Sequence, residues 1–454
     1  MKIHPHGLML EELVISLSRR DRALVEHVTG CQECRRRLGW MLGHPPGPLA
    51  RKLAQILPWP ADEGGYDAAL ASAERAVQVR QLALDHERAE APVLLDELTG
   101  QPAERRGIMV RHQRRFRNWA LADLLIERSR ERCFQDPADS EELARLGLGV
   151  TAVLDAGEHG AERIADLQAR AWGRIGNSLR VRADLAAAAA AFETAFDYLQ
   201  RGTGESLERA DLLDLKASLL RDQRRFEEAM RLLRRALHIF LAAEERRRAA
   251  KTLVKMSTLH EHTGPEQAIP VLVQALELLD RDRDPRLYLN AQHNLITNLA
   301  EAGRFMEAQR LMIQARPLYA RFPDRWMRHR RTWAEGKIAR GLGQSGDAEA
   351  HLLAARDGFF AVEAPYEGAL AALDLASLYA QQGRTAELKR LAEETLPIFA
   401  SLRIHREALA ALTLWHRAVL AEKAGGELAA EVAAYLKRAR IDPELRFREG
   451  AAAS

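Results

Sequence analysis

Small and apolar residues recur along most of the chain with a period of about 40 residues. The residues that mark the period are Ala188, Ala229, Ala268, Ala308, Ala348 and Leu388. Further small or apolar residues follow four positions later at Phe192, Leu233, Leu272, Met312, Leu352 and Ala392, and seven positions later at Ala195, Ala236, Ala275, Ala315 and Ala355. Positions spaced by four and seven lie on one face of an α-helix. The pattern predicts a series of similar helices, each packed through this face.

One stretch shows the whole repeat unit. Between residues 172 and 195, apolar and small residues stand at Trp172, Gly176, Leu179, Ala188, Phe192 and Ala195. This spacing resembles a tetratricopeptide repeat (TPR), with units longer than the standard one. The resemblance implies an all-α fold, a right-handed TPR-like α-solenoid of helix pairs, in which the first helix of each pair lines an inner groove.

The regions around the array follow from breaks in the pattern. We expect the TPR-like array over residues 161–400 and a C-terminal capping pair of helices over 401–448. Residues 66–160 are predicted to be helical and to contain a degenerate repeat, with Pro92 stopping or kinking a long first helix. A Pro- and Gly-rich linker is expected at 44–65. Residues 1–43 are expected to form a separate module.

The N-terminal module contains an H-x3-C-x2-C motif formed by His27, Cys31 and Cys34. Two thiolates and an imidazole supply three ligands for zinc, and Cys31 and Cys34 would share one face at the start of a helix. The nearest upstream donors are His4 and His6. The motif resembles the zinc-binding anti-sigma factor domain, which implies a structural zinc held by His4, His27, Cys31 and Cys34, with His6 as the alternative to His4.

Two other readings of the cysteine pair remain. One is a redox-active C-x-x-C and the other is a metal-free helix corner. Neither is favoured, because no βαβ pattern surrounds the motif. The anti-sigma resemblance further implies a sigma factor as a possible partner.

The inner groove is the candidate binding site. One position of the first helices carries mostly short polar side chains, at Asn177, Ser218, Ser257, Thr297, Lys337 and Ser377. Flanking positions of the same helices add Arg180, Asp214, Arg221, His293 and Trp333. We refer to these eleven residues as the inner row. They offer hydrogen-bonding groups that could hold a protein or peptide segment, although an ordinary solvated face would have a similar composition.

Composition limits the other function classes. Lys and Arg number 67 and Asp and Glu 64, so the net charge of +3 gives no general support for nucleic-acid binding. Neither an apolar stretch long enough to span a membrane nor a signal-peptide core occurs, and we expect a cytoplasmic protein. No phosphate-binding loop or nucleophile motif supports an enzyme.

The sequence therefore predicts a non-enzymatic adaptor or regulator. Its TPR solenoid would bind a protein or peptide, and its zinc module would link it to transcription regulation. The alternative is an interaction scaffold whose zinc module is purely structural and contacts no sigma factor. A nucleic-acid-binding regulator is the least favoured reading.

Overall fold

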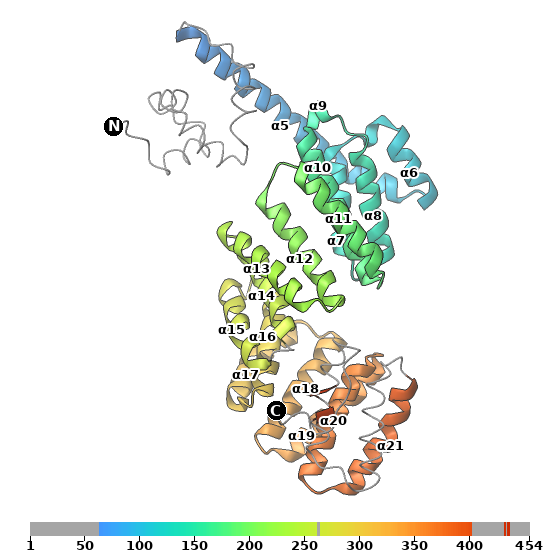
Figure 1. The fold of residues 1–454 in the computed structure, drawn as a ribbon, viewed down its shortest axis with the longest axis vertical. Helices are drawn as coiled ribbons and strands as arrows, with labels where there is room; N and C mark the ends of the chain where they lie inside the picture. The colour runs from blue at the N-terminus through green and yellow to red at the C-terminus, as the bar shows by residue number, and fades with distance from the viewer. Residues whose placement is uncertain (1–62, 261–263, 402–430, 433, 436–454) are drawn as a thin grey trace, which may run out of the picture. The chain divides into compact units, whose positions relative to one another are not determined.

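The structure, a computed structural model, describes residues 63–260, 264–401, 431–432 and 434–435. All regular secondary structure within these residues is helical (Figure 1). The predicted zinc module, most of the linker and nearly all of the capping region lie outside the described residues. The chain divides into two compact units, with the boundary after Leu219.

The first unit contains seven helices, one 3-10 turn and most of an eighth helix among its described residues. They are α5 (Glu63–Thr99), α6 (Ala103–His112), η1 (Arg114–Phe116), α7 (Trp119–Arg132), α8 (Pro137–Thr151), α9 (Ala156–His159), α10 (Ala161–Val181), α11 (Leu185–Arg201) and α12 (Ser206–Asp222), which crosses the boundary. Contacts between α7 and α8 and between α10 and α11 define two helix pairs.

Helix α5 does not end at Pro92, contrary to the stop that the sequence suggests. Its last part buries Ala91, Leu94, Leu95 and Leu98, and α5 packs against α7. This tertiary packing offsets the hydrogen bond that proline removes from the helix. Of the two outcomes expected at Pro92, the helix end is therefore wrong.

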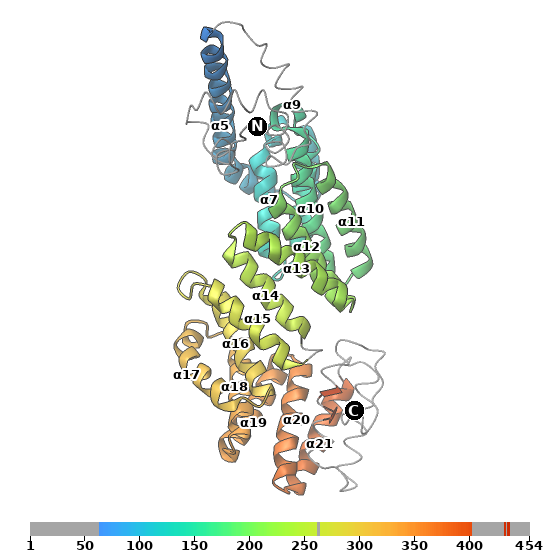
Figure 2. The same ribbon diagram turned by 60° about the vertical axis from the view of Figure 1, so that its left-hand side comes forward.

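The second unit is a regular succession of helix pairs. Its described helices are α13 (Phe226–Ala242), α14 (Arg246–Leu259), α15 (Pro265–Leu278), α16 (Pro285–Glu301), α17 (Phe305–Arg321), α18 (Arg325–Gly341), α19 (Ser345–Ala361), α20 (Pro365–Gln381) and α21 (Thr385–Ser401). Each helix contacts the next one in the chain, and Figures 1 and 2 show them stacked in chain order. The predicted all-α, TPR-like solenoid is confirmed.

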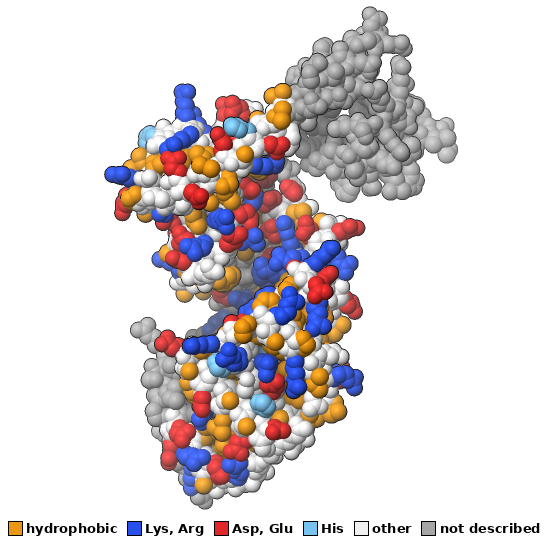
Figure 3. All heavy atoms as spheres, turned by 180° about the vertical axis from the view of Figure 1, so that it is seen from behind, with side chains coloured by type: hydrophobic (Ala, Val, Ile, Leu, Met, Phe, Trp, Pro, Cys, Tyr) orange, Lys and Arg blue, Asp and Glu red, His pale blue; other side chains and the backbone are white. Residues whose placement is uncertain are grey.

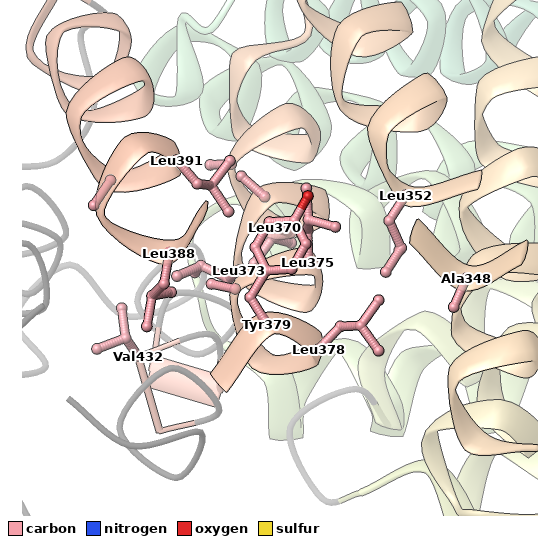
Figure 4. Close-up of a cluster of buried hydrophobic side chains, with 14 of the residues drawn as sticks. Ala348, Leu352, Leu370, Leu373, Leu375, Leu378, Tyr379, Leu388, Leu391 and Val432 are labelled. Carbon is pink, nitrogen blue, oxygen red and sulfur yellow. The ribbon is translucent and has the colours of Figure 1, made fainter. Parts of the chain in front are cut away.

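The repeating small residues account for the close packing of the helices. Ala188, Ala229, Ala268, Ala308 and Ala348 are completely buried, and each lies in the second helix of a pair. The larger residue four positions later fills the space beside it. Leu352 does so in the cluster of Figure 4, which joins side chains of α19, α20 and α21. Burying a side chain of this size contributes roughly 1.5–3 kcal/mol.

The turn inside five of the described helix pairs contains a residue with a left-handed backbone. Gly303, Gly343 and Gly383 have φ values of 76°, 74° and 66° at this turn. Ala183 and Arg224 occupy the equivalent position with φ values of 64° and 65°. The turn geometry is therefore kept even where the residue is not glycine, at some conformational cost.

Candidate functional site

Three first helices of the second unit, α16, α18 and α20, contact one another in succession. Helix α18 touches both α16 and α20. Polar side chains join the three helices. Arg330 of α18 donates to Asn294 Oδ1 of α16 at 3.0 Å, and Trp333 Nε1 of α18 donates to Asp374 Oδ2 of α20 at 2.8 Å. The inner row therefore lies on neighbouring helices in this unit.

Lys337 is the centre of this contact. Its Nζ lies 2.9 Å from Glu301 Oε1, 3.8 Å from Asp374 Oδ2 and 4.0 Å from the centre of the Trp333 ring. Arg340 Nη1 adds an ion pair with Asp374 Oδ1 at 3.0 Å. We call Glu301, Trp333, Lys337, Arg340 and Asp374 the Lys337 network. It connects α16, α18 and α20 through charge.

The network keeps Lys337 charged although its side chain is only 6% exposed. Burial on its own would lower the pKa of Lys337. The carboxylates of Glu301 and Asp374 outweigh burial and raise this pKa above its ordinary value of 10.5. Glu301 and Arg340 remain more accessible, with side chains 27% and 25% exposed. A ligand on this face would meet the edges of the network rather than Lys337 itself.

His293 lies inside the second unit. Its Nδ1 is 2.7 Å from the Tyr319 hydroxyl, and the two rings meet edge to face. Burial, aided by the positive charges of Arg330 and Lys337, lowers the pKa of His293 well below 6.5. The structure therefore gives this side chain a neutral, packed environment at physiological pH.

The hydroxyl residues of the inner row bond within their own helices. Ser257, Thr297 and Ser377 donate to the carbonyl oxygens of Val254, His293 and Leu373 at 2.8, 3.0 and 3.0 Å. Ser257 and Ser377 are buried, whereas Thr297 is partly exposed. Arg221 is also partly exposed and pairs with Asp222 at 2.8 Å. Among these four inner-row residues, Thr297 and Arg221 are therefore more accessible than Ser257 and Ser377.

The inner-row residues of the first unit are all buried. Asn177 Nδ2 donates to Cys133 Sγ at 2.9 Å, and Arg180 Nε donates to Asn177 Oδ1 at 3.1 Å. Asp214 and Ser218 are each 8% exposed, and the Ser218 hydroxyl donates to the Asp214 carbonyl. Their role in binding stays a prediction.

A second charged cluster, in the first unit, is outside the predicted row. Arg170 of α10 lies 2.6 Å from Asp123 and 3.4 Å from Glu127 of α7, and 3.7 Å from Glu208 of α12. Arg170 and Arg330 are 160 residues apart, which is four repeat periods, so they occupy the same position of the repeat. In the repeat of α18 this position comes three residues before Trp333. The equivalence with Arg330 could have identified Arg170 as an inner-face residue from the sequence. The sequence does not show its acidic partners, because they come from α7 and α12.

Glu208 is the unusual member of this cluster. Burial, together with the negative charges of Asp211, Glu205 and Asp166, raises its pKa from 4.5 to about 7. The attraction of Arg170 acts in the opposite direction and is outweighed. A carboxyl group that titrates near neutral pH is therefore placed between the first helices α10 and α12.

The predicted zinc ligands His4, His6, His27, Cys31 and Cys34 lie outside the described residues. Within the described part of the chain, no group of three or more His, Cys, Asp or Glu side chains is arranged to hold a metal ion. None of the described helices is long and apolar enough to cross a membrane.

Comparisons with known proteins agree on the fold. The family model for soluble NSF attachment protein, SNAP, matches residues 153–314. No curated protein matches the chain.

Solved structures give broader matches. A Rap protein complexed with competence and sporulation factor is similar with a TM-score of 0.53 and 13% identity, covering 71% of this chain and 88% of that one. The apo form of RapI gives the same TM-score and coverage at 12% identity. Aspartyl phosphate phosphatase F from Bacillus subtilis gives a TM-score of 0.49 at 12% identity, covering 89% of this chain and 97% of that one. Together with the repeats described above, the likeness to the two Rap structures shows that the chain has a TPR-like helical-repeat fold.

Proposed function

We propose that the protein is a non-enzymatic, cytoplasmic adaptor or regulator that binds a protein or peptide along the inner face of its first helices. The observation that carries this proposal is the polar connection of α16, α18 and α20 through the Lys337 network and the Arg330–Asn294 bond. Such a row combines fixed charges with partly exposed hydrogen-bonding groups, as peptide recognition requires.

Two features support a peptide rather than a small substrate. The polar groups are spread over the first helices of three successive pairs, which suits an elongated ligand. They are also held by one another, so little side-chain entropy is lost when a ligand arrives. The similar Rap structure contains a bound factor, and its likeness to this chain makes the proposal reasonable for a shared fold.

The test selects peptides from a random phage-displayed library on the immobilised full chain. A selected peptide is then titrated by fluorescence anisotropy against the wild type, Thr297→Arg and Thr194→Arg. Thr297 is on α16 and partly exposed on the inner row. Thr194 is on the second helix α11 and makes the same type of bond, to the carbonyl four residues earlier. It is therefore a matched control.

We expect Thr297→Arg to weaken binding at least tenfold, which corresponds to about 1.4 kcal/mol. Thr194→Arg should bind as the wild type does. Selection of no peptide, or equal binding by all three proteins, would contradict the proposal.

We further propose that residues 1–43 bind one structural zinc ion through His4 or His6, His27, Cys31 and Cys34, and that this module contacts a sigma factor. The H-x3-C-x2-C motif supports this, because thiolate and imidazole are the preferred ligands of structural zinc. Zinc would stabilise a segment that is too short for a substantial core of its own.

Zinc content and sigma-factor capture can be measured together with the full chain. The wild type should contain one equivalent of zinc and retain a sigma factor from host lysate. Replacing Cys31 and Cys34 together by Ser should abolish both and leave the thermal melting of the array unchanged. Capture that persists without zinc would leave the module a purely structural role, and unchanged zinc content would exclude the ligand assignment.

A further inference from the structure

Helix α13 exposes a basic face to solvent. Arg231, Arg234, Arg235 and His238 are all exposed, and their spacing of three, four and seven residues places them along one side of the helix. The opposite side buries Ala229, Leu233, Ala236 and Phe240 in the array. We call the four exposed residues the α13 basic face. It extends over about 10 Å at 1.5 Å per residue.

The charges on this face are poorly neutralised. Arg234 and Arg235 make no ion pair with any described residue. Arg231 lies 3.8 Å from Glu228, and that carboxylate is already bonded to Arg225 at 2.6 Å. Figure 3 shows Lys and Arg side chains gathered at the level where α13 and α14 lie in Figure 1. Part of this positive charge is therefore available to an external partner.

The structural repeat does not require basic residues here. The equivalent positions of the other second helices are exposed or partly exposed wherever the structure describes their side chains. Their residues are Ala190, Glu193, Thr194 and Asp197; Pro270, Val273, Gln274 and Glu277; Arg310, Ile313, Gln314 and Pro317; Ala350, Leu353, Ala354 and Asp357; and Arg390, Glu393, Glu394 and Pro397. Only Arg310 and Arg390 among them are basic. Solvent exposure alone therefore does not explain why all four of these positions are basic on α13.

Acidic residues limit the length of a partner on this face. Glu227 and Glu228 begin α13, and Glu244 and Glu245 follow its end. A nucleic acid that continued past the face in either direction would bring its phosphates close to these carboxylates. A short acidic segment can end before it reaches them. The charge pattern thus favours a protein segment over an extended polyanion.

We propose that the α13 basic face is a docking site for a short acidic helix of another protein, one that presents Asp or Glu side chains at positions i, i+3, i+4 and i+7. The matching spacing lets carboxylates and guanidinium groups form charge-assisted hydrogen bonds along the two helices. This site is on a second helix, whereas the inner face belongs to first helices, so the proposal does not depend on peptide binding at the inner face.

The test uses the full chain and a fluorescein-labelled helical peptide with Glu at i, i+3, i+4 and i+7. A peptide of the same length with Gln at these positions is the ligand control. Arg234→Glu combined with Arg235→Glu replaces two positive charges of the α13 basic face by negative ones. Arg310→Glu combined with Arg316→Glu is the matched control, because it makes the same charge change at exposed positions of α17. A 15-nucleotide oligo(dT) and anionic phosphatidylserine vesicles are tested in parallel.

We expect the Glu peptide to bind the wild type and the α17 control alike at 50 mM salt, and to bind the α13 variant at least tenfold more weakly. The Gln peptide should not bind, and added salt should weaken binding of the Glu peptide. Equal binding by the α13 variant would overturn the proposal. So would tighter binding of the oligonucleotide or vesicles through the same arginines, or self-association of the chain that the α13 substitutions abolish.

All variants are first compared by thermal melting. The substituted side chains are exposed, so the variants should melt at nearly the same temperature as the wild type. Loss of peptide binding without loss of stability then reports on the face itself.

Discussion

Replacing Glu208 by Gln should stabilise the folded protein at alkaline pH. The Glu208 side chain is 20% exposed, and its carboxylate is 3.7 Å from Arg170. Burial and the neighbouring acidic groups nevertheless raise the pKa of Glu208 to about 7. The ionised form is therefore less stable in the folded protein than in water, and Gln removes that ionisation while keeping nearly the same shape.

The size of the effect follows from proton linkage. The pKa of Glu208 is about 7 in the folded protein and close to its ordinary value of 4.5 in the unfolded chain. At about 1.4 kcal/mol per pKa unit, this gap corresponds to about 3 kcal/mol. Since the folded pKa is the higher one, the contribution of Glu208 to stability is complete below pH 4.5. It falls as the pH rises and is lost above pH 7.

Urea unfolding at several pH values between 4.5 and 8.5 measures this difference. The Glu208→Gln protein should match the wild type near pH 4.5 and exceed its free energy of unfolding by about 3 kcal/mol at pH 8. Hydrogen exchange of α10 and α12 should show where the added protection lies. Glu162→Gln, at an exposed position of α10, is the control and should give a nearly constant difference. A flat difference for Glu208→Gln would refute the reasoning.

Three further substitutions test the packing. Lys337→Met leaves the partly exposed carboxylates of Glu301 and Asp374 without their shared cation and should lower the free energy of unfolding by about 1–3 kcal/mol in urea titrations; a loss below 1 kcal/mol would show that the pairs contribute little. Tyr319→Phe removes the partner of His293 Nδ1 and should cost about 1–3 kcal/mol, while the NMR signal of His293 should remain that of a neutral ring as the pH falls below 6.5, the ordinary pKa of histidine, in both proteins. Ala183→Gly relieves a residue with φ of 64° and should raise the melting temperature, and a lower one would contradict the strain at this turn.

The fold could be predicted because its signal is local. Small residues at Ala188 and its equivalents, with a larger apolar residue one turn later, identify the buried face of each second helix. The structure buries Ala188 and Phe192 completely. The period of about 40 residues then gives the number of helix pairs in the array. Neighbouring pairs must stack to cover these faces.

The candidate site could be predicted less completely from the sequence. Register places Lys337 and His293 on the inner side of their helices, but it does not reveal how far adjacent helices cover them. Lys337 is 5% exposed and His293 2% exposed. Arg170 was missed for the related reason that its partners Asp123 and Glu208 come from α7 and α12. Ion pairs between helices depend on which side chains meet after stacking, and no local spacing encodes that.

The burial of these polar residues changes what the inner face can offer a ligand. A cation such as Lys337, paired with two carboxylates, is costly to expose again, so a ligand that required it would first have to break those pairs. Asn294 and Thr297 of α16 and Arg340 of the Lys337 network keep part of their surface exposed. We therefore expect substitutions at Lys337 to act on stability, and substitutions at these three positions to act on affinity. Measuring both quantities for Lys337→Met and Thr297→Arg separates the two roles, since a partner that contacts Lys337 directly would make affinity fall in a Lys337→Met protein that is still folded.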